Sequence, residues 1–267
     1  MSLVVAPRSP VLARLVSSLG YAACDELPAR RERILPSGDI SLMVNLHEDE
    51  FRTYDAEGRV RRVRGAMLAG PRATHTVIDT AEQRCTVSVS FTPGGASAFF
   101  AMPLSEACDQ LVELGDVWGR DGALVRERLC EASSPEAMLR RLEAILLEHL
   151  GPTAPDPAVG FAAAAFERGR TVAQVASRLG LLPRPFVRRF RAQLGLTPKR
   201  FSRVRRLQRV LVDVHPGGAI DWADIAVKHG YFDQAHLIND FRELTDITPA
   251  AYAASVGCHR NHVPLAG

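Results

Sequence analysis

The sequence predicts an α+β protein in which a β-rich N-terminal domain with helices precedes an all-α C-terminal domain. Three observations lead to this prediction. Apolar and polar residues alternate over residues 40–46 and 85–91, which is the period of a strand with one buried face. After the Thr-Pro-Gly-Gly stretch of residues 92–95 the apolar period becomes helical. In the C-terminal half, one helix–glycine–helix pattern occurs twice.

Length and composition exclude several other classes. The chain has 267 residues, of which 46% are hydrophobic and 24% are charged, as in globular proteins rather than disordered or coiled-coil ones. It contains no run of about 18 apolar residues and no signal-peptide pattern, so we expect a cytoplasmic protein without a membrane partner. Five cysteines lack C-x-x-C spacing. We therefore expect reduced, mostly buried thiols, no disulfide framework, no metal site and no cofactor.

The N-terminal domain is expected over residues 1–150. Residues 51–54 and 60–69 flank a turn at residues 55–58 and would add strands to the two already described, giving an antiparallel sheet or a small barrel. Helical spacing of apolar residues predicts a helix over residues 135–149. That helix is either part of the core or a dimerisation helix, and the sequence does not separate the two.

Charge and proline content divide the chain at the same place. Residues 151–157 hold three prolines and a glycine, which predicts a linker. Residues 1–157 carry 17 arginines and 22 acidic residues, a net charge of −5, whereas residues 158–267 carry 16 basic and 8 acidic residues, a net charge of +8. The basic part is the one expected to contact a polyanion. Residues 258–267 are expected to form a frayed tail.

The repeat lies in the basic part. Residues 171–180 align with residues 221–230, so that Gly180 falls on Gly230, and the following segments align after one inserted residue. Each copy predicts a helix-turn-helix: a short helix, a glycine that can adopt a positive φ at its end, and a second helix with aromatic or aliphatic core residues.

A long helix is expected between the two repeats, over residues 199–214, with Val204, Leu207 and Leu211 facing inward. Such a helix can hold the two units at a fixed separation. Successive major grooves on one face of DNA lie about 34 Å apart, so two reading helices must be set to that distance. The repeat, its spacing and its positive charge together indicate a DNA-binding protein.

Residues 230–252, with the sequence GYFDQAHLINDFRELTDITPAAY, resemble the signature of the AraC/XylS transcription regulators, and the first repeat is similar to the upstream unit of that family. The resemblance covers residues 158–257. It implies seven helices that form two helix-turn-helix units reading adjacent major grooves. It also implies an N-terminal domain that binds an effector or dimerises, and residues 1–150 resemble the family in layout only.

The resemblance also implies which side chains contact DNA. It places the first recognition helix at residues 183–193 and the second at residues 233–244. The residues implied as base readers, because arginine suits guanine while glutamine and asparagine suit adenine, are Arg184, Val187, Arg188, Gln234, Ala235 and Asn239. The residues implied as phosphate contacts are Lys199, Arg200, Arg203 and His236.

Three positions depart from the usual pattern of the family. Arginine is common where Asn239 stands, glycine where Asp246 stands, and a helix-capping serine where Leu182 stands. The base preference of the second helix and the turn that follows it are therefore expected to differ from the common pattern.

We expect a sequence-specific transcription regulator on double-stranded promoter DNA at the nucleoid, and not an enzyme. A small-molecule effector of the N-terminal domain, RNA polymerase and a second copy of the chain are the other expected partners. Arg72 and His75, beside the Gly70-Pro71 turn, are the candidate effector contacts. Two alternatives stay open: an N-terminal catalytic domain tethered to the DNA-binding unit, and a constitutive regulator whose N-terminal domain only dimerises.

Overall fold

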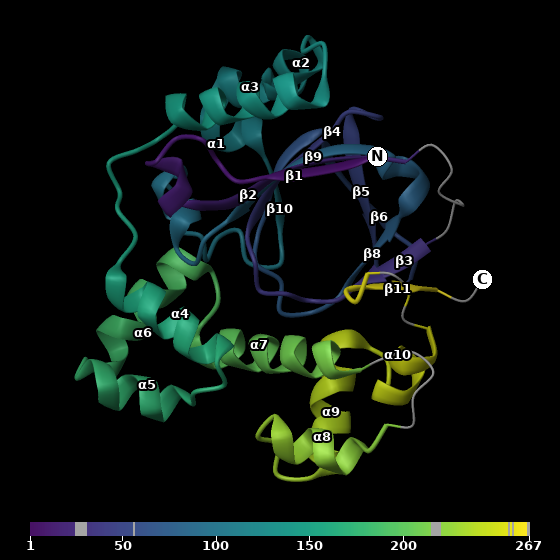
Figure 1. Cartoon of the computed structure of the whole chain (residues 1–267), viewed down its shortest axis with the longest axis vertical. Helices are drawn as coiled ribbons and strands as arrows, with labels where there is room; N and C mark the ends of the chain where they lie inside the picture. The colour runs from purple at the N-terminus through teal and green to yellow at the C-terminus, as the bar shows by residue number, and fades with distance from the viewer. Residues whose placement is uncertain (25–30, 56, 215–219, 256, 258, 266–267) are drawn as a thin grey trace.

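The computed structural model describes residues 1–24, 31–55, 57–214, 220–255, 257 and 259–265. Two β-sheets face each other in the N-terminal part, with helices α1 to α3 on one side and the C-terminal helices α4 to α10 along the opposite side (Figure 1). The α+β class, with a β-rich N-terminal domain ahead of a helical C-terminal domain, is confirmed. All strand pairs in the described residues are antiparallel.

The first sheet has six strands. Their order is β1 (Ser2–Val5), β2 (Val16–Ala23), β9 (Cys85–Phe91), β4 (Ser41–Asn45), β7 (Ala66–Ala69) and β10 (Leu111–Glu113). The strand predicted at residues 85–91 is confirmed with the same bounds, and the one predicted at residues 40–46 is shorter by one residue at each end. The alternating pattern was reliable here because this sheet buries one face under helices.

The second sheet has five strands. Their order is β11 (His262–Pro264), β3 (Arg31–Ile34), β8 (Thr76–Asp79), β5 (Glu50–Tyr54) and β6 (Val60–Arg64). β11 comes from the segment that we expected to fray, but it pairs with β3, His262 opposite Ile34. The Tyr252 hydroxyl donates to the Arg260 carbonyl at 2.9 Å, which fixes the chain ahead of the strand. The predicted hairpin turn includes Ala56, which lies outside the described residues, and Gly58 N donates to Asp55 O across it at 3.0 Å.

Three helices cover the outer face of the first sheet: α1 (Leu114–Ala123), α2 (Val125–Cys130) and α3 (Pro135–Glu148). Short 3-10 turns lie at Leu12–Arg14, Thr80–Gln83 and Gly95–Ala98. Leu142, Ile145 and Leu146 of α3 are fully buried against the sheet. Complete burial of such a side chain contributes about 1.5–3 kcal/mol. The helix predicted at residues 135–149 is therefore a core helix.

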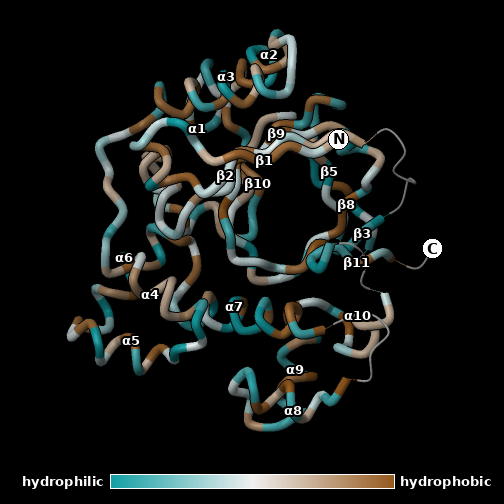
Figure 2. Tube along the Cα trace, in the orientation of Figure 1, coloured by the Kyte–Doolittle hydropathy of each residue, from teal (hydrophilic) through white to brown (hydrophobic). Residues whose placement is uncertain are grey.

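The C-terminal domain consists of α4 (Pro157–Glu167), α5 (Val172–Leu179), α6 (Pro183–Leu194), α7 (Pro198–Asp213), α8 (Trp222–Lys228), α9 (Gln234–Thr245) and α10 (Pro249–Ser255). The linker ends at Asp156, whose carboxylate caps α4 by accepting from Ala158 N at 2.8 Å. Figure 2 shows α7 as a largely hydrophilic helix between the N-terminal domain and the helices below it. No helix in the described parts of the chain is long and apolar enough to cross a membrane.

The two domains share packing and hydrogen bonds. Leu35 and Ala73 of the N-terminal domain are buried in the core formed by the C-terminal helices. Along α7, Arg205 pairs with Asp39 at 3.0 Å and Gln208 Nε2 donates to the Pro36 carbonyl at 2.8 Å. The C-terminal helices are therefore docked on the N-terminal domain.

The cysteines differ from the expectation of mostly buried thiols. Cys24 and Cys130 are exposed, and Cys85 and Cys108 are partly buried. Cys24 follows the end of β2 and Cys130 ends α2, so neither lies within the apolar face of its element. Burial raises the pKa of the Cys108 thiol. Cys258 lies outside the described residues.

The domain contact gives a test at Gly195. Gly195 has φ +74°, and a Cβ there would lie 2.3 Å from Pro71 Cγ. Gly180 has φ +59°, and a Cβ there would have nothing within 4 Å. Gly195→Ala and Gly180→Ala should both lose about 1–2 kcal/mol through backbone strain, and G195A a further 1–3 kcal/mol through overpacking. Denaturant titration measures both values, and equal losses would contradict the close packing at Pro71.

Candidate nucleic-acid interface

The first unit is formed by α5 and α6. A capping box is present at the start of α5: Thr171 Oγ1 accepts from Gln174 N at 3.2 Å, and Gln174 Oε1 accepts from Thr171 N at 2.9 Å. Gly180 ends α5 in the left-handed conformation, which glycine adopts at little steric cost. The predicted helix–glycine–helix unit is confirmed.

The predicted recognition helix, α6, presents an exposed face. It begins at Pro183, whose fixed φ suits the first helical position, and Leu182 ahead of it makes no capping bond through its side chain. Phe186 and Phe190 are buried on the inner side. The three predicted base readers are exposed and follow the i, i+3, i+4 spacing of one helix face: Arg184, Val187 and Arg188.

The second unit repeats this arrangement in α8 and α9. Asp233 caps α9, its carboxylate accepting from His236 N at 2.7 Å. Leu237 and Phe241 are buried on the inner side of the helix. The predicted base readers of α9 are exposed: Gln234, Ala235 and Asn239.

The four predicted phosphate contacts lie in different surroundings. Lys199 is exposed at the start of α7, and His236 is exposed on α9, where its Nδ1 accepts from Phe232 N at 3.3 Å. Arg200 is exposed too, but it pairs with Asp109 of the N-terminal domain at 3.4 Å. Arg203 is partly buried, with 27% of its side chain exposed.

Arg203 belongs to a charged cluster between α7 and α9. Its guanidinium pairs with Asp240, and its Nη1 donates to Glu243 Oε1 at 2.7 Å. Arg206 Nη2 and the Tyr231 hydroxyl each donate to Asp240 Oδ2 at 3.1 Å. The hydrogen bond with Glu243 raises the pKa of Arg203, and burial raises the pKa of Tyr231. The Asp240 carboxylate, paired with Arg203 and Arg206, therefore holds α9 on α7.

The departure from the family pattern at Asp246 has a structural explanation. Asp246 follows α9 with φ +61°, a conformation that glycine adopts freely and that aspartate tolerates better than most residues. Its carboxylate pairs with Arg33 of β3 at 3.3 Å. A glycine would keep the turn but lose this bridge between the domains.

A groove of about 590 Å³ separates the face of α6 from the N-terminal domain. Leu104 N of the N-terminal domain donates to the Ala192 carbonyl of α6 at 2.8 Å and fixes the loop beside the helix. The groove is lined by Pro103, Ser105, Pro183, Arg184, Val187, Arg188, Arg191 and Ala192. The predicted base readers of α6 therefore face a loop of the N-terminal domain.

Arg72 and His75, the candidate effector contacts, lie at the boundary between the domains. His75 N donates to the Leu244 carbonyl of α9 at 3.1 Å. Arg72 Nε is buried and has no hydrogen-bond partner. Burial lowers the pKa of both side chains, and Arg33 lowers that of His75 further.

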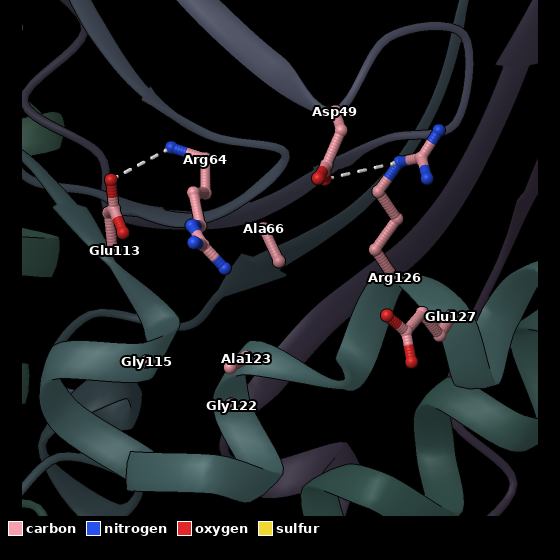
Figure 3. A pocket seen from close by; sticks show the side chains of 9 residues that line it. All are labelled: Asp49, Arg64, Ala66, Glu113, Gly115, Gly122, Ala123, Arg126 and Glu127. Carbon is pink, nitrogen blue, oxygen red and sulfur yellow. Dashed lines mark hydrogen bonds and ion pairs between the residues drawn. The ribbon is translucent and has the colours of Figure 1, made fainter.

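A second cavity, of about 300 Å³, lies in the N-terminal domain and does not include Arg72 or His75 (Figure 3). Its charged lining residues are Asp49, Arg64, Glu113, Arg126 and Glu127. They come from β6, the end of β10, α2 and the loop between β4 and β5. Sequence reasoning missed them because only the tertiary packing of these strands, the loop and α2 brings the residues together.

Two protein families match parts of the chain. Residues 175–255 match the family described as helix-turn-helix domain, and residues 5–113 match a family described as a domain of unknown function, DUF6597. No curated protein matches the chain.

Solved structures are similar to the chain at low identity. ToxT from Vibrio cholerae O395 shares 12% identity over 88% of this chain and 96% of ToxT, with a TM-score of 0.45. Wild-type ToxT from Vibrio cholerae strain SCE256, bound to an unsaturated fatty acid, shares 10% over 94% of each chain, with a TM-score of 0.43. The xylose-binding transcription activator XylR shares 17% over 44% of this chain and 38% of its own, with a TM-score of 0.31.

The two repeated units and the match over residues 175–255 define the class of the C-terminal domain: it is a DNA-binding helix-turn-helix domain. This match agrees with the resemblance of residues 230–252 to the signature of the AraC/XylS regulators.

Proposed function

We propose that residues 158–257 read promoter DNA through α6 and α9, with the bases contacted by Arg184, Val187, Arg188, Gln234, Ala235 and Asn239. One observation supports this assignment above all: these six side chains lie on the outward faces of two helices whose inward faces are buried. Arginine on α6 suits guanine, and the amides of α9 suit adenine. The two helices would therefore prefer different base sequences.

Phosphate contacts are assigned to Lys199 and His236, which are exposed. Arg200 would also contact a phosphate once its ion pair with Asp109 is broken. We place Arg203 in a different role from the one that the family pattern implied. Its pairs with Asp240 and Glu243 orient α9, and a DNA phosphate would have to replace both partners.

The N-terminal domain, residues 1–150, is proposed as a sensor whose docking controls access to DNA. In the docked arrangement, the loop at Pro103 and Ser105 faces α6, and Asp109 pairs with Arg200. Arg33 of β3 also pairs with Asp246 and so holds the second helix-turn-helix unit on the N-terminal domain. A small molecule that binds the docked and undocked states with different affinity would shift the population between them. Arg72 and His75 lie in this boundary and would respond to such a shift.

Two other proposals concern the macromolecular partners of the chain and whether its N-terminal domain is catalytic. RNA polymerase and a second copy of the chain are proposed as further partners, with action at the nucleoid in the cytoplasm. The alternative of a catalytic N-terminal domain requires a reactive group beside a general base. The cavity of this domain is lined by carboxylates and guanidinium groups, and we propose that it binds a ligand rather than catalyses a reaction.

Base and phosphate contacts are distinguished by two substitutions, measured on a duplex selected by the full-length protein and on random DNA. Arg188→Ala should cost about 1–3 kcal/mol on the selected duplex and relax its sequence preference. Lys199→Ala should weaken binding to both duplexes equally and reduce the salt slope by about one. Equal losses on both duplexes from R188A would contradict the base-reading role.

The proposed docking control is tested at the Arg33–Asp246 ion pair. Both Arg33→Gln and Asp246→Asn remove the pair, and asparagine tolerates the positive φ of residue 246. Because an exposed ion pair contributes about 0.2–1 kcal/mol, both variants should raise DNA affinity by up to about fivefold in a fluorescence anisotropy titration. Asp224→Asn, an exposed charge change on α8, is the control. An increase with D246N but not with R33Q would indicate a charge effect on DNA and would contradict docking control.

A further inference from the structure

The cavity of the N-terminal domain has walls that the backbone fixes. Gly122 and Gly115 form one side of it. A Cβ at Gly122 would lie 2.1 Å from the Leu114 carbonyl oxygen, so a larger residue there has no room. Across the cavity, a Cβ at Gly65 would lie 3.0 Å from both Arg126 and Asp49. The backbone is therefore closely packed at Gly122, which lines the cavity, and at Gly65, which lies between the lining residues Arg64 and Ala66.

Two of the charged groups are held in place by backbone bonds. Arg126 Nε donates to the Asn45 carbonyl at 2.8 Å, and its Nη2 donates to the Leu46 carbonyl at 3.3 Å. Glu113 Oε1 accepts from Arg64 N at 3.0 Å. Asn45 is itself fully buried, and its amide donates to two carbonyls of neighbouring segments. A guanidinium and a carboxylate are thus oriented in advance on different walls.

The other charges stand apart from one another. Figure 3 shows Arg64 and Glu127 on different sides of the cavity, Arg64 toward the end of β10 and Glu127 on α2. Asp49 lies beside Arg126, with 3.6 Å between Asp49 Oδ1 and Arg126 Nε. The cavity therefore offers separate positive and negative groups to one occupant.

These groups select the chemistry of the occupant. Arginine recognises carboxylates, often in a bidentate manner, whereas three carboxylates would repel a polyanion such as a nucleotide. Two arginines likewise disfavour a bare metal cation. A volume of about 300 Å³ is at the small end of ligand-binding pockets. The occupant that satisfies all of these conditions carries one carboxylate and one ammonium group.

We propose that this cavity binds a small zwitterion of the amino acid class, with its carboxylate held by Arg64 and Arg126 and its ammonium group held by Glu127 and Glu113. That this ligand acts as the effector rests on the proposed function. β10 (Leu111–Glu113) connects the two regions, because Glu113 lies in the cavity while Asp109, just before the strand, pairs with Arg200 of α7. A ligand that moves Glu113 acts on the strand that leads to the domain contact.

The test is isothermal titration calorimetry of the full-length protein, without DNA, against each protein amino acid, with acetate and methylammonium as single-charge controls. At least one amino acid should bind, and neither control should bind as tightly. Arg64→Gln and Glu127→Gln should each weaken that binding by about tenfold or more, because each removes a charged hydrogen-bond partner. Arg62→Gln is the matched control, since Arg62 lies on the same strand, outside the cavity, and pairs with Glu50. R62Q should bind as the wild type does.

Three results would overturn the assignment: no amino acid binds, acetate binds as tightly as any amino acid, or R64Q and E127Q both bind as the wild type does. Both variants change exposed side chains, and thermal unfolding shows whether they are folded. Binding of DNA is measured separately, both without ligand and with the amino acid that binds. If DNA does not bind under either condition, the proposed regulator is refuted and the zwitterion site is unaffected, whereas failure of the titration leaves the proposed DNA reading unaffected.

Discussion

The constraint on which the rest of the structure depends is the rigidity of α7. Its apolar side, which includes Phe201, Val204 and Leu207, is buried in the core that the two helix-turn-helix units share. Its charged side binds the buried carboxylate of Asp240 and so fixes α9. Two reading helices can match successive major grooves only if their separation is constant. A single helix packed against both units supplies that constancy.

The N-terminal domain is docked on the same helix. Arg200 of α7 pairs with Asp109, and Arg205 and Gln208 bond to Asp39 and Pro36, so α7 contacts two segments of that domain. Any change in how the N-terminal domain docks would therefore change its contacts with α7, the helix that separates α6 from α9. The proposed sensor could act directly on both units, because the groove beside α6 and the ion pair at Asp246 lie on the same boundary between the domains.

The sequence predicted the local features well and the long-range ones poorly. The Pro183 start of α6 and the strand at residues 85–91 depend on neighbouring residues and on the period of the pattern, so they could be found. The partner of Asp246 is Arg33, far away in the chain, and the strand at residues 262–264 exists only because β3 is beside it. The cavity residues likewise meet only through the packing of strands and α2, and Cys24 and Cys130 are exposed because they lie at the ends of their elements.

The central claim is that two helices, fixed by α7, read DNA together. Selection of bound sequences from a random duplex pool with the full-length protein, at about physiological salt, tests it most directly. The account predicts two conserved blocks whose centres lie about one helical turn apart, one for α6 and one for α9. A single conserved block, or two blocks at variable spacing, would contradict the rigid pair of readers.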